Sequence, residues 1–125
     1  MTRPHPQPKR VYLLFINTQR SDAMELVITH EATTHTAMLS GQLTYADTKQ
    51  FKTLLELVTE KTITELDIDF THLSFIDSAG MGMLLLLRDE CQNRNIRISL
   101  RGAYGQVERI FTISKFDQLF SMKAQ

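Results

Sequence analysis

Two kinds of hydrophobic spacing alternate along this chain, and their order limits the folds that it can adopt. Residues 65–70 alternate apolar and acidic side chains, which is the spacing of a strand with one buried face. Residues 51–58 carry apolar side chains three and four positions apart, which is the spacing of a helix with one apolar face. Strands that alternate with such helices predict an α/β fold, in which helices pack against a mixed, mostly parallel β-sheet.

The expected elements run from Met24 to the end of the chain, and residues 24–125 are interpreted as one domain. A chain of 125 residues has the length of a single domain. In chain order, we expect strands over residues 24–30 and 34–40, a helix that Thr44 or Asp47 caps, a strand over 65–70, a loop over 71–77, a helix from Ser78 to about Arg94, a strand over 96–100, a helix over 104–114 and a last apolar segment over 116–122.

Residues 1–23 are interpreted as an N-terminal extension. Prolines stand at every second position from Pro4 to Pro8, and such a segment is not a folding unit. Residues 11–16 are apolar enough for a short strand, but a polar stretch separates them from the next apolar run. We therefore expect the extension to be flexible or to add one edge strand.

Composition excludes several classes of function. The whole chain carries 14 Lys and Arg and 14 Asp and Glu, whereas residues 24–125 carry 10 and 13. Mild acidity without a basic stripe argues against nucleic acid as a ligand. The single cysteine, Cys91, excludes an internal disulfide and a thiolate cluster, and it favours a reducing compartment. No apolar run approaches the roughly 20 residues that span a bilayer, so we expect a cytoplasmic protein without direct membrane insertion.

The segment around Ser78 carries the clearest functional signal. Ser78 stands where the loop is expected to give way to a helix, directly after Asp77. Serine is a favoured N-cap, so its hydroxyl could serve stability alone. Alternatively, an exposed hydroxyl followed by the small residues Ala79 and Gly80 could be phosphorylated. The phosphate would add about −1.5 to −2 charges beside Asp77 and would repel a docked partner.

The helix that begins at Ser78 has more apolar surface than one sheet can cover. From Met81 to Leu87, apolar side chains run around most of its circumference. A neighbouring helix could cover the excess. Alternatively, Met81 and its neighbours form an adaptable docking patch beside Ser78, since methionine suits interfaces that rearrange.

Catalytic and ligand-binding motifs are weak in this sequence. Ile76 stands where a nucleophile elbow would need its first glycine, and Leu85 stands where a dinucleotide fingerprint would need its third. The histidines lack the spacing of a metal site. We therefore expect no enzymatic activity, no cofactor and no metal.

One run of residues resembles a known family. The run FIDSAGMGMLLLL, preceded by DIDF and followed by IRISL and FDQLF, resembles the STAS domains, and most closely the bacterial anti-sigma factor antagonists. Leu39, Gly41 and Leu43 are similar to the Leu-x-Gly-x-Leu segment of that family. The resemblance covers about Met24 to Met122. The family frequently has a second hydroxyl residue after the serine. Here that position is Ala79, so Ser78 is the only candidate phosphate acceptor in the motif.

The resemblance implies control by partner switching. The unphosphorylated protein, a monomer or weak dimer, would bind an anti-sigma factor that is also a serine kinase of the histidine-kinase-like ATPase class, and so release a sigma factor. The kinase would phosphorylate Ser78, and a PP2C-type phosphatase would reverse this. The alternative is a constitutive STAS-like scaffold, such as an accessory subunit of a lipid-transport ABC complex, with Ser78 only a helix cap. The residues implied in partner binding are Asp77, Ala79, Gly80, Met81 and Asp47.

Overall fold

The computed structural model describes residues 10–14, 23–60 and 62–123, and it contains one six-stranded sheet in the order β1-β2-β3-β4-β5-β6. The pairs β1–β2 and β2–β3 are antiparallel, whereas β3–β4, β4–β5 and β5–β6 are parallel. The predicted α/β class with a mixed, mostly parallel sheet is therefore confirmed. The elements are β1 (Arg10–Leu14), β2 (Glu25–Glu31), β3 (Thr34–Leu43), η1 (Tyr45–Asp47), α1 (Thr48–Glu60), β4 (Glu65–Ile76), α2 (Ser78–Asn93), β5 (Arg97–Arg101), α3 (Gly105–Ile113), η2 (Phe116–Gln118) and β6 (Ser121–Lys123).

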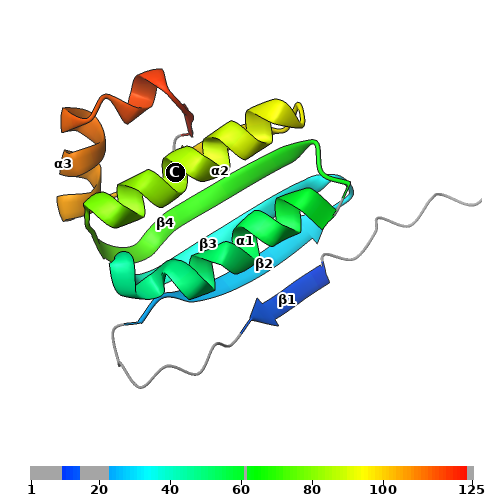
Figure 1. Cartoon of the computed structure of the whole chain (residues 1–125), viewed down its shortest axis with the longest axis horizontal. Helices are drawn as coiled ribbons and strands as arrows, with labels where there is room; N and C mark the ends of the chain where they lie inside the picture. Colours follow the sequence, from blue (N-terminus) through cyan, green and yellow to red (C-terminus); the bar gives the residue numbers. More distant parts are fainter. Residues whose placement is uncertain (1–9, 15–22, 61, 124–125) are drawn as a thin grey trace, which may run out of the picture.

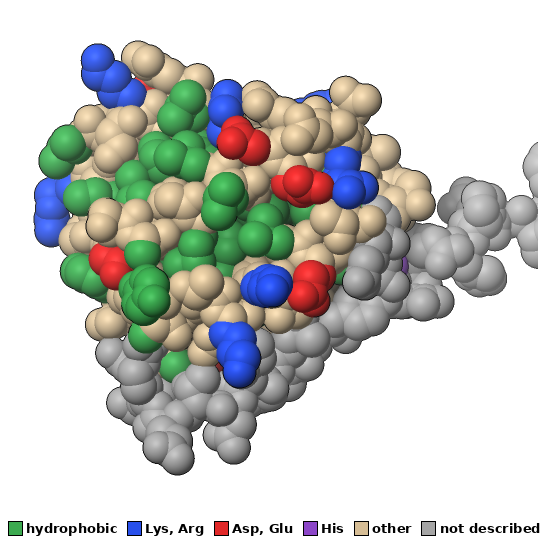
Figure 2. All heavy atoms as spheres, in the orientation of Figure 1, with side chains coloured by type: hydrophobic (Ala, Val, Ile, Leu, Met, Phe, Trp, Pro, Cys, Tyr) green, Lys and Arg blue, Asp and Glu red, His purple; other side chains and the backbone are tan. Residues whose placement is uncertain are grey.

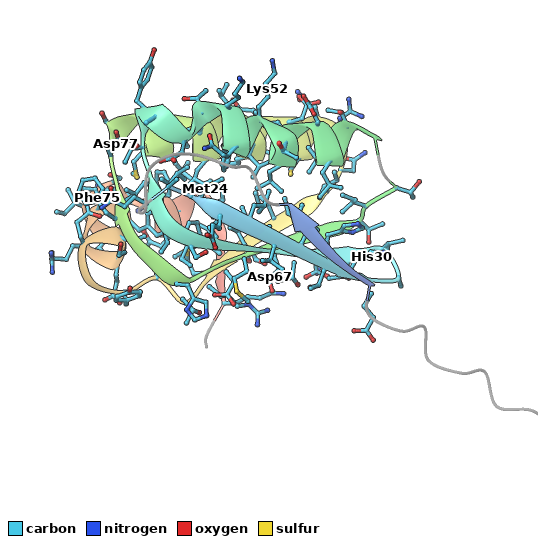
Figure 3. The ribbon with its side chains drawn as sticks, turned by 90° about the horizontal axis from the view of Figure 1, so that it is seen from below. Met24, His30, Lys52, Asp67, Phe75 and Asp77 are labelled. Carbon is cyan, nitrogen blue, oxygen red and sulfur yellow. The ribbon has the colours of Figure 1, made fainter. Side chains whose placement is uncertain are left out.

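Helices α1 and α2 lie side by side across one face of the sheet (Figures 1 and 3). Their apolar stripes meet the strand side chains that point to the same face, and together these form one core. Phe51 of α1, Leu84 of α2 and Phe70 of β4 are all fully buried there. Each such side chain contributes about 1.5–3 kcal/mol through burial. The helical spacing recognised in the sequence therefore serves to cover one side of the sheet.

The other face of the sheet is polar around β4, β5 and β6. Asp67 is buried there, and Ser99 Oγ donates to its Oδ1 over 3.0 Å. The guanidinium of Arg101 also donates to Asp67, and Lys123 Nζ lies 3.1 Å from a carboxylate oxygen of Glu65. A buried carboxylate is tolerated at this place because hydroxyl and cationic donors satisfy it.

Strand β4 is longer than predicted, and the expected loop over residues 71–77 is wrong for residues 71–76. The strand continues to Ile76 because β3 extends alongside it, pairing Gly41 with Leu73 and Leu43 with Ile76. Register shifts in this pairing interrupt the regular alternation of apolar and polar side chains that identifies a strand in the sequence, and polar side chains lie on the outer face. Beyond the end of β5, the side chain of Gln106 replaces the neighbouring strand as the hydrogen-bond partner of β4. Its Oε1 accepts from Ile76 N–H over 3.0 Å, and its Nε2 donates to Ile76 C=O over 2.8 Å.

Both ends of the described chain add short edge strands. The backbone of Arg10–Leu14 forms β1 against β2, which is one of the two states expected for the N-terminal extension. The remaining positions of that extension lie outside the described residues, apart from Ala23. The predicted apolar segment over 116–122 comprises the short turn η2 and the beginning of β6. Phe116 and Phe120 from this segment pack into the core.

Candidate functional site

Ser78 is the first residue of α2, and its side chain is exposed. The N-cap of the helix is Asp77, whose backbone is extended and whose Oδ1 accepts a hydrogen bond of 2.8 Å from Gly80 N–H. The hydroxyl of Ser78 makes no hydrogen bond with any residue that the structure describes. The interpretation of Ser78 as a helix cap is therefore wrong, because Asp77 already performs that function.

Asp77 also joins the helix to the turn that follows β3. Its Oδ2 accepts a hydrogen bond of 3.1 Å from the backbone N–H of Tyr45, the first residue of η1. Its own backbone N–H donates to Leu43 C=O over 3.2 Å. One side chain thus links two segments that are 32 positions apart in the sequence.

Gly80 lies inside this junction. A Cβ built on Gly80 would lie 2.7 Å from Ile76 Cγ1 and would also collide with the carbonyl oxygen of Leu43. Gly80 is buried, so the prediction that it contacts a partner directly is corrected: it allows α2 to approach β3. Ala79 and Met81 remain half-buried, and Met81 packs partly against the core.

Asp47 supports the same turn from inside the domain. It is completely buried, and its Oδ1 accepts a hydrogen bond of 3.1 Å from Met24 N–H. Its Oδ2 accepts from Thr44 N–H over 2.9 Å and completes a capping box with Thr44. The prediction of a partner contact through Asp47 is therefore corrected, since the side chain has no surface to offer; it holds the start of β2 and the turn together.

Two exposed aromatic residues near Asp77 were not predicted. Tyr45 is 79% exposed although its backbone is tied to Asp77, and Phe75 is 38% exposed at the end of β4. Figure 3 shows Phe75 and Asp77 at the same end of the domain, with His30 at the opposite end. In the sequence, the one sign of this site is that an aromatic residue, Tyr45, directly follows the Leu39–Thr44 segment. Its closeness to Asp77 depends on pairing between distant strands.

The apolar excess of α2 is only partly covered by α1. Leu85 is half-buried against the core, whereas Leu86 is 60% exposed. Leu86 lines a shallow groove between the two helices together with Leu55 and Thr59 of α1. In Figure 2, hydrophobic side chains gather across the face that carries α1 and α2, with charged side chains around them. The neighbouring helix thus covers part of the excess, and an apolar strip remains accessible.

Metal ligands do not cluster in the described segments: no group of three or more His, Cys, Asp or Glu side chains could hold an ion there. None of the helices in the same segments is both long and apolar enough to cross a bilayer. What the described residues at Asp77 and Ser78 offer for chemistry is the exposed hydroxyl of Ser78.

Comparison with known proteins supports a common fold. An anti-sigma factor antagonist, SpoIIAA in its unphosphorylated form, superposes with a TM-score of 0.68 at 24% identity, covering 82% of this chain and 88% of its own. An anti-sigma factor antagonist from Mycobacterium paratuberculosis has a TM-score of 0.73 at 13% identity, covering 84% and 89%. A sulfate transporter family protein from Wolinella succinogenes has a TM-score of 0.60 at 17% identity, covering 69% and 70%. At these identities the likeness is one of fold.

Sequence similarity assigns the family. A STAS-domain containing protein of Pseudomonas aeruginosa (strain UCBPP-PA14) is 33% identical over 87 residues, which cover 70% of this chain and 85% of that protein. The family model described as the STAS domain matches residues 24–125, the range interpreted above as the folded body. The chain therefore belongs to the STAS domain family.

Proposed function

We propose that this STAS domain is an anti-sigma factor antagonist that works by partner switching at Ser78. The unphosphorylated form binds an anti-sigma factor that is also a serine kinase, and the bound sigma factor or other target is released. Phosphorylation of Ser78 abolishes the binding, and a PP2C-type phosphatase restores it. The domain is then a substrate of the kinase and not itself an enzyme, and it acts in the cytoplasm.

The observation that carries this proposal is the division of roles between Asp77 and Ser78. Asp77 caps α2, so the exposed hydroxyl of Ser78 is available to a kinase without loss of a structural hydrogen bond. A phosphate on Ser78 would sit at the positive end of the helix, which tolerates anions. The modified domain therefore stays folded, while the surface at Ser78 gains bulk and negative charge.

The fold relatives agree with this proposal. SpoIIAA is an anti-sigma factor antagonist that has an unphosphorylated and a phosphorylated form, so a protein of this fold can be both an antagonist and a phosphoprotein. In the present chain, Ser78 follows the strand β4 and opens α2, where a partner could reach it together with half-buried Ala79 and Met81.

The test compares the affinity of the candidate kinase and anti-sigma factor encoded in the same operon for wild type, Ser78→Ala and Ser78→Asp, by isothermal titration calorimetry. We expect Ser78→Ala to bind like wild type and Ser78→Asp to lose at least about tenfold, or about 1.4 kcal/mol. Ser121→Asp is the matched control, because Ser121 is an exposed serine on β6. Incubation with the kinase and ATP should add one phosphate to wild type and none to Ser78→Ala, as measured by mass spectrometry.

A second candidate is a constitutive scaffold or accessory subunit, for which the fold likeness to a sulfate transporter family protein is the supporting observation. In that case Ser78→Ala, Ser78→Asp and wild type would bind their partner equally well while remaining folded. Equal binding would therefore reject the phosphorylation switch and favour the scaffold.

A further inference from the structure

We propose that Tyr45 is a second partner-contacting residue of the Ser78 site, and that phosphorylation of Ser78 withdraws it by breaking the hydrogen bond between Tyr45 N–H and Asp77. This inference rests on the proposed function and deepens it, because it names a contact and the path by which phosphate controls it. The partner would offer Tyr45 an apolar pocket with a polar group for the phenol hydroxyl.

Tyr45 combines a fixed backbone with an accessible ring. Its N–H donates to Asp77 Oδ2 over 3.1 Å, and its C=O accepts from Thr48 Oγ1 over 2.6 Å. The side chain is nevertheless 79% exposed, the largest exposure among the large hydrophobic residues that the structure describes. Because its backbone is fixed, partner binding has to order only the two side-chain torsions of Tyr45, and tyrosine is enriched among residues that dominate interface energies. Tyr45 therefore has the properties of an anchor for a partner.

Phosphate on Ser78 would compete with Asp77 for the same backbone donors. The first turn of α2 offers the N–H groups of Ser78 and Ala79, which donate to no other described residue, and that of Gly80, which Asp77 Oδ1 already occupies. A phosphate carries about −1.5 to −2 charges and three acceptor oxygens, against one charge on the carboxylate. The two anions would be attached to adjacent residues and would repel each other.

The weaker anion, Asp77, therefore yields its place, and its Oδ2 leaves Tyr45 N–H. The rest of the turn remains anchored by a separate carboxylate, since Asp47 binds Thr44 N–H over 2.9 Å and Met24 N–H over 3.1 Å. The change is thus confined to the Tyr45–Asp77 link. Phosphorylation acts twice on the partner surface: it adds charge at Ser78, and it releases Tyr45 from the position in which the partner binds it.

The first test needs no partner. The full chain is produced with phosphoserine at position 78, and amide hydrogen exchange is measured by NMR against the unmodified chain. We expect Tyr45 N–H to exchange at least about tenfold faster after phosphorylation, while Met24 N–H, held by Asp47, keeps its protection. Phosphoserine at position 121 is the control and should change neither amide. Unchanged protection of Tyr45 in the Ser78-phosphorylated chain overturns the inference.

The second test measures binding of Tyr45→Ala to the candidate anti-sigma partner. We expect a loss of at least about tenfold, and no further loss when Tyr45→Ala is combined with phosphoserine at position 78, because the ring is already withdrawn there. Ile113→Ala, at a residue that is 75% exposed on α3, is the matched control and should bind like wild type. Full binding by Tyr45→Ala overturns the inference and leaves the phosphorylation switch standing. Full binding by Ser78→Asp rejects the proposed function, and the inference with it.

Discussion

Gly80, in the first turn of α2, lies directly against the backbone carbonyl of Leu43 at the end of β3. The contact leaves no room for a side chain, and it places the helix start beside the turn that carries Tyr45. Asp77 can reach Gly80 N–H and Tyr45 N–H at the same time only because these two segments are so close. The glycine is thus a condition for the geometry of the candidate site.

Replacing Gly80 by alanine is expected to lower the free energy of unfolding by about 1–3 kcal/mol, because the new methyl group meets backbone and the side chain of Ile76. Gly82→Ala is the matched control, since a Cβ at Gly82 has no neighbour within 4 Å. There the higher helix propensity of alanine should leave the stability unchanged or raise it by up to about 1 kcal/mol. Urea unfolding of both variants measures the difference, and equal effects would contradict the close approach.

Removing the N-cap and removing the hydroxyl are expected to have different costs. Asp77→Ala should destabilise the domain by about 0.5–2 kcal/mol, because Gly80 N–H and Tyr45 N–H lose their acceptor. Ser78→Ala should stay within about 0.5 kcal/mol of wild type, as an exposed substitution does. Thermal unfolding by circular dichroism gives both values. A cost for Ser78→Ala as large as that for Asp77→Ala would restore the serine to a structural function.

The parts of the fold that the sequence predicted correctly share one property, which is a periodic local pattern. The helix stripe around Phe51 and the strand alternation from Leu66 to Phe70 each reflect burial of one face, so spacing alone identifies them. The second half of β4 lacks such a pattern, because it depends on pairing with β3 through shifted registers. The sequence therefore predicts a loop over residues 71–76, although these residues form a strand.

In the candidate site, too, local sequence patterns predict only part of the structure. Aspartate and serine are both favoured N-caps, so adjacent Asp77 and Ser78 cannot be told apart by residue preference. The helix begins at Ser78, one residue earlier than a Ser78 cap would require, and that single position decides which side chain is accessible. The link from Asp77 to Tyr45 joins residues 32 positions apart, and no spacing rule detects such a contact. The sequence thus located the motif but did not assign the functions within it.

The buried carboxylate on the polar face of the sheet gives a third prediction. Asp67→Ala should lower the free energy of unfolding by about 1.5–3 kcal/mol, because Ser99 and Arg101 both lose a charged acceptor in a site that is 3% exposed. Glu90→Ala is the control, since its i,i+4 ion pair with Arg94 is solvent-exposed and worth only about 0.3–0.5 kcal/mol. Urea unfolding of the two variants tests this, and similar small losses would show that the Asp67 cluster does not stabilise the sheet.

Cys91 gives a prediction about reactivity and pH. It is completely buried in α2, and burial raises the pKa of its thiol to about 12, with the carboxylate of Glu90 acting in the same direction. At pH 8 the thiolate fraction in the folded state is therefore on the order of 10⁻⁴. Alkylation by iodoacetamide should be very slow in the native protein and fast in urea, and because the chain has one cysteine, the whole signal reports this site.

The same shift links Cys91 to stability. Since the pKa is raised in the folded state, the contribution of the neutral thiol is complete below the unfolded pKa of about 8.5 and declines as the pH rises toward 12. The difference in unfolding free energy between wild type and Cys91→Ala should therefore shrink from pH 8 to pH 11.

The variant Gly80→Ala loosens the start of the same helix. Its thiol should be alkylated faster than that of wild type, because the reagent reaches Cys91 when the helix opens locally. Rapid alkylation of the native wild type at pH 8 would contradict the buried, protonated thiol.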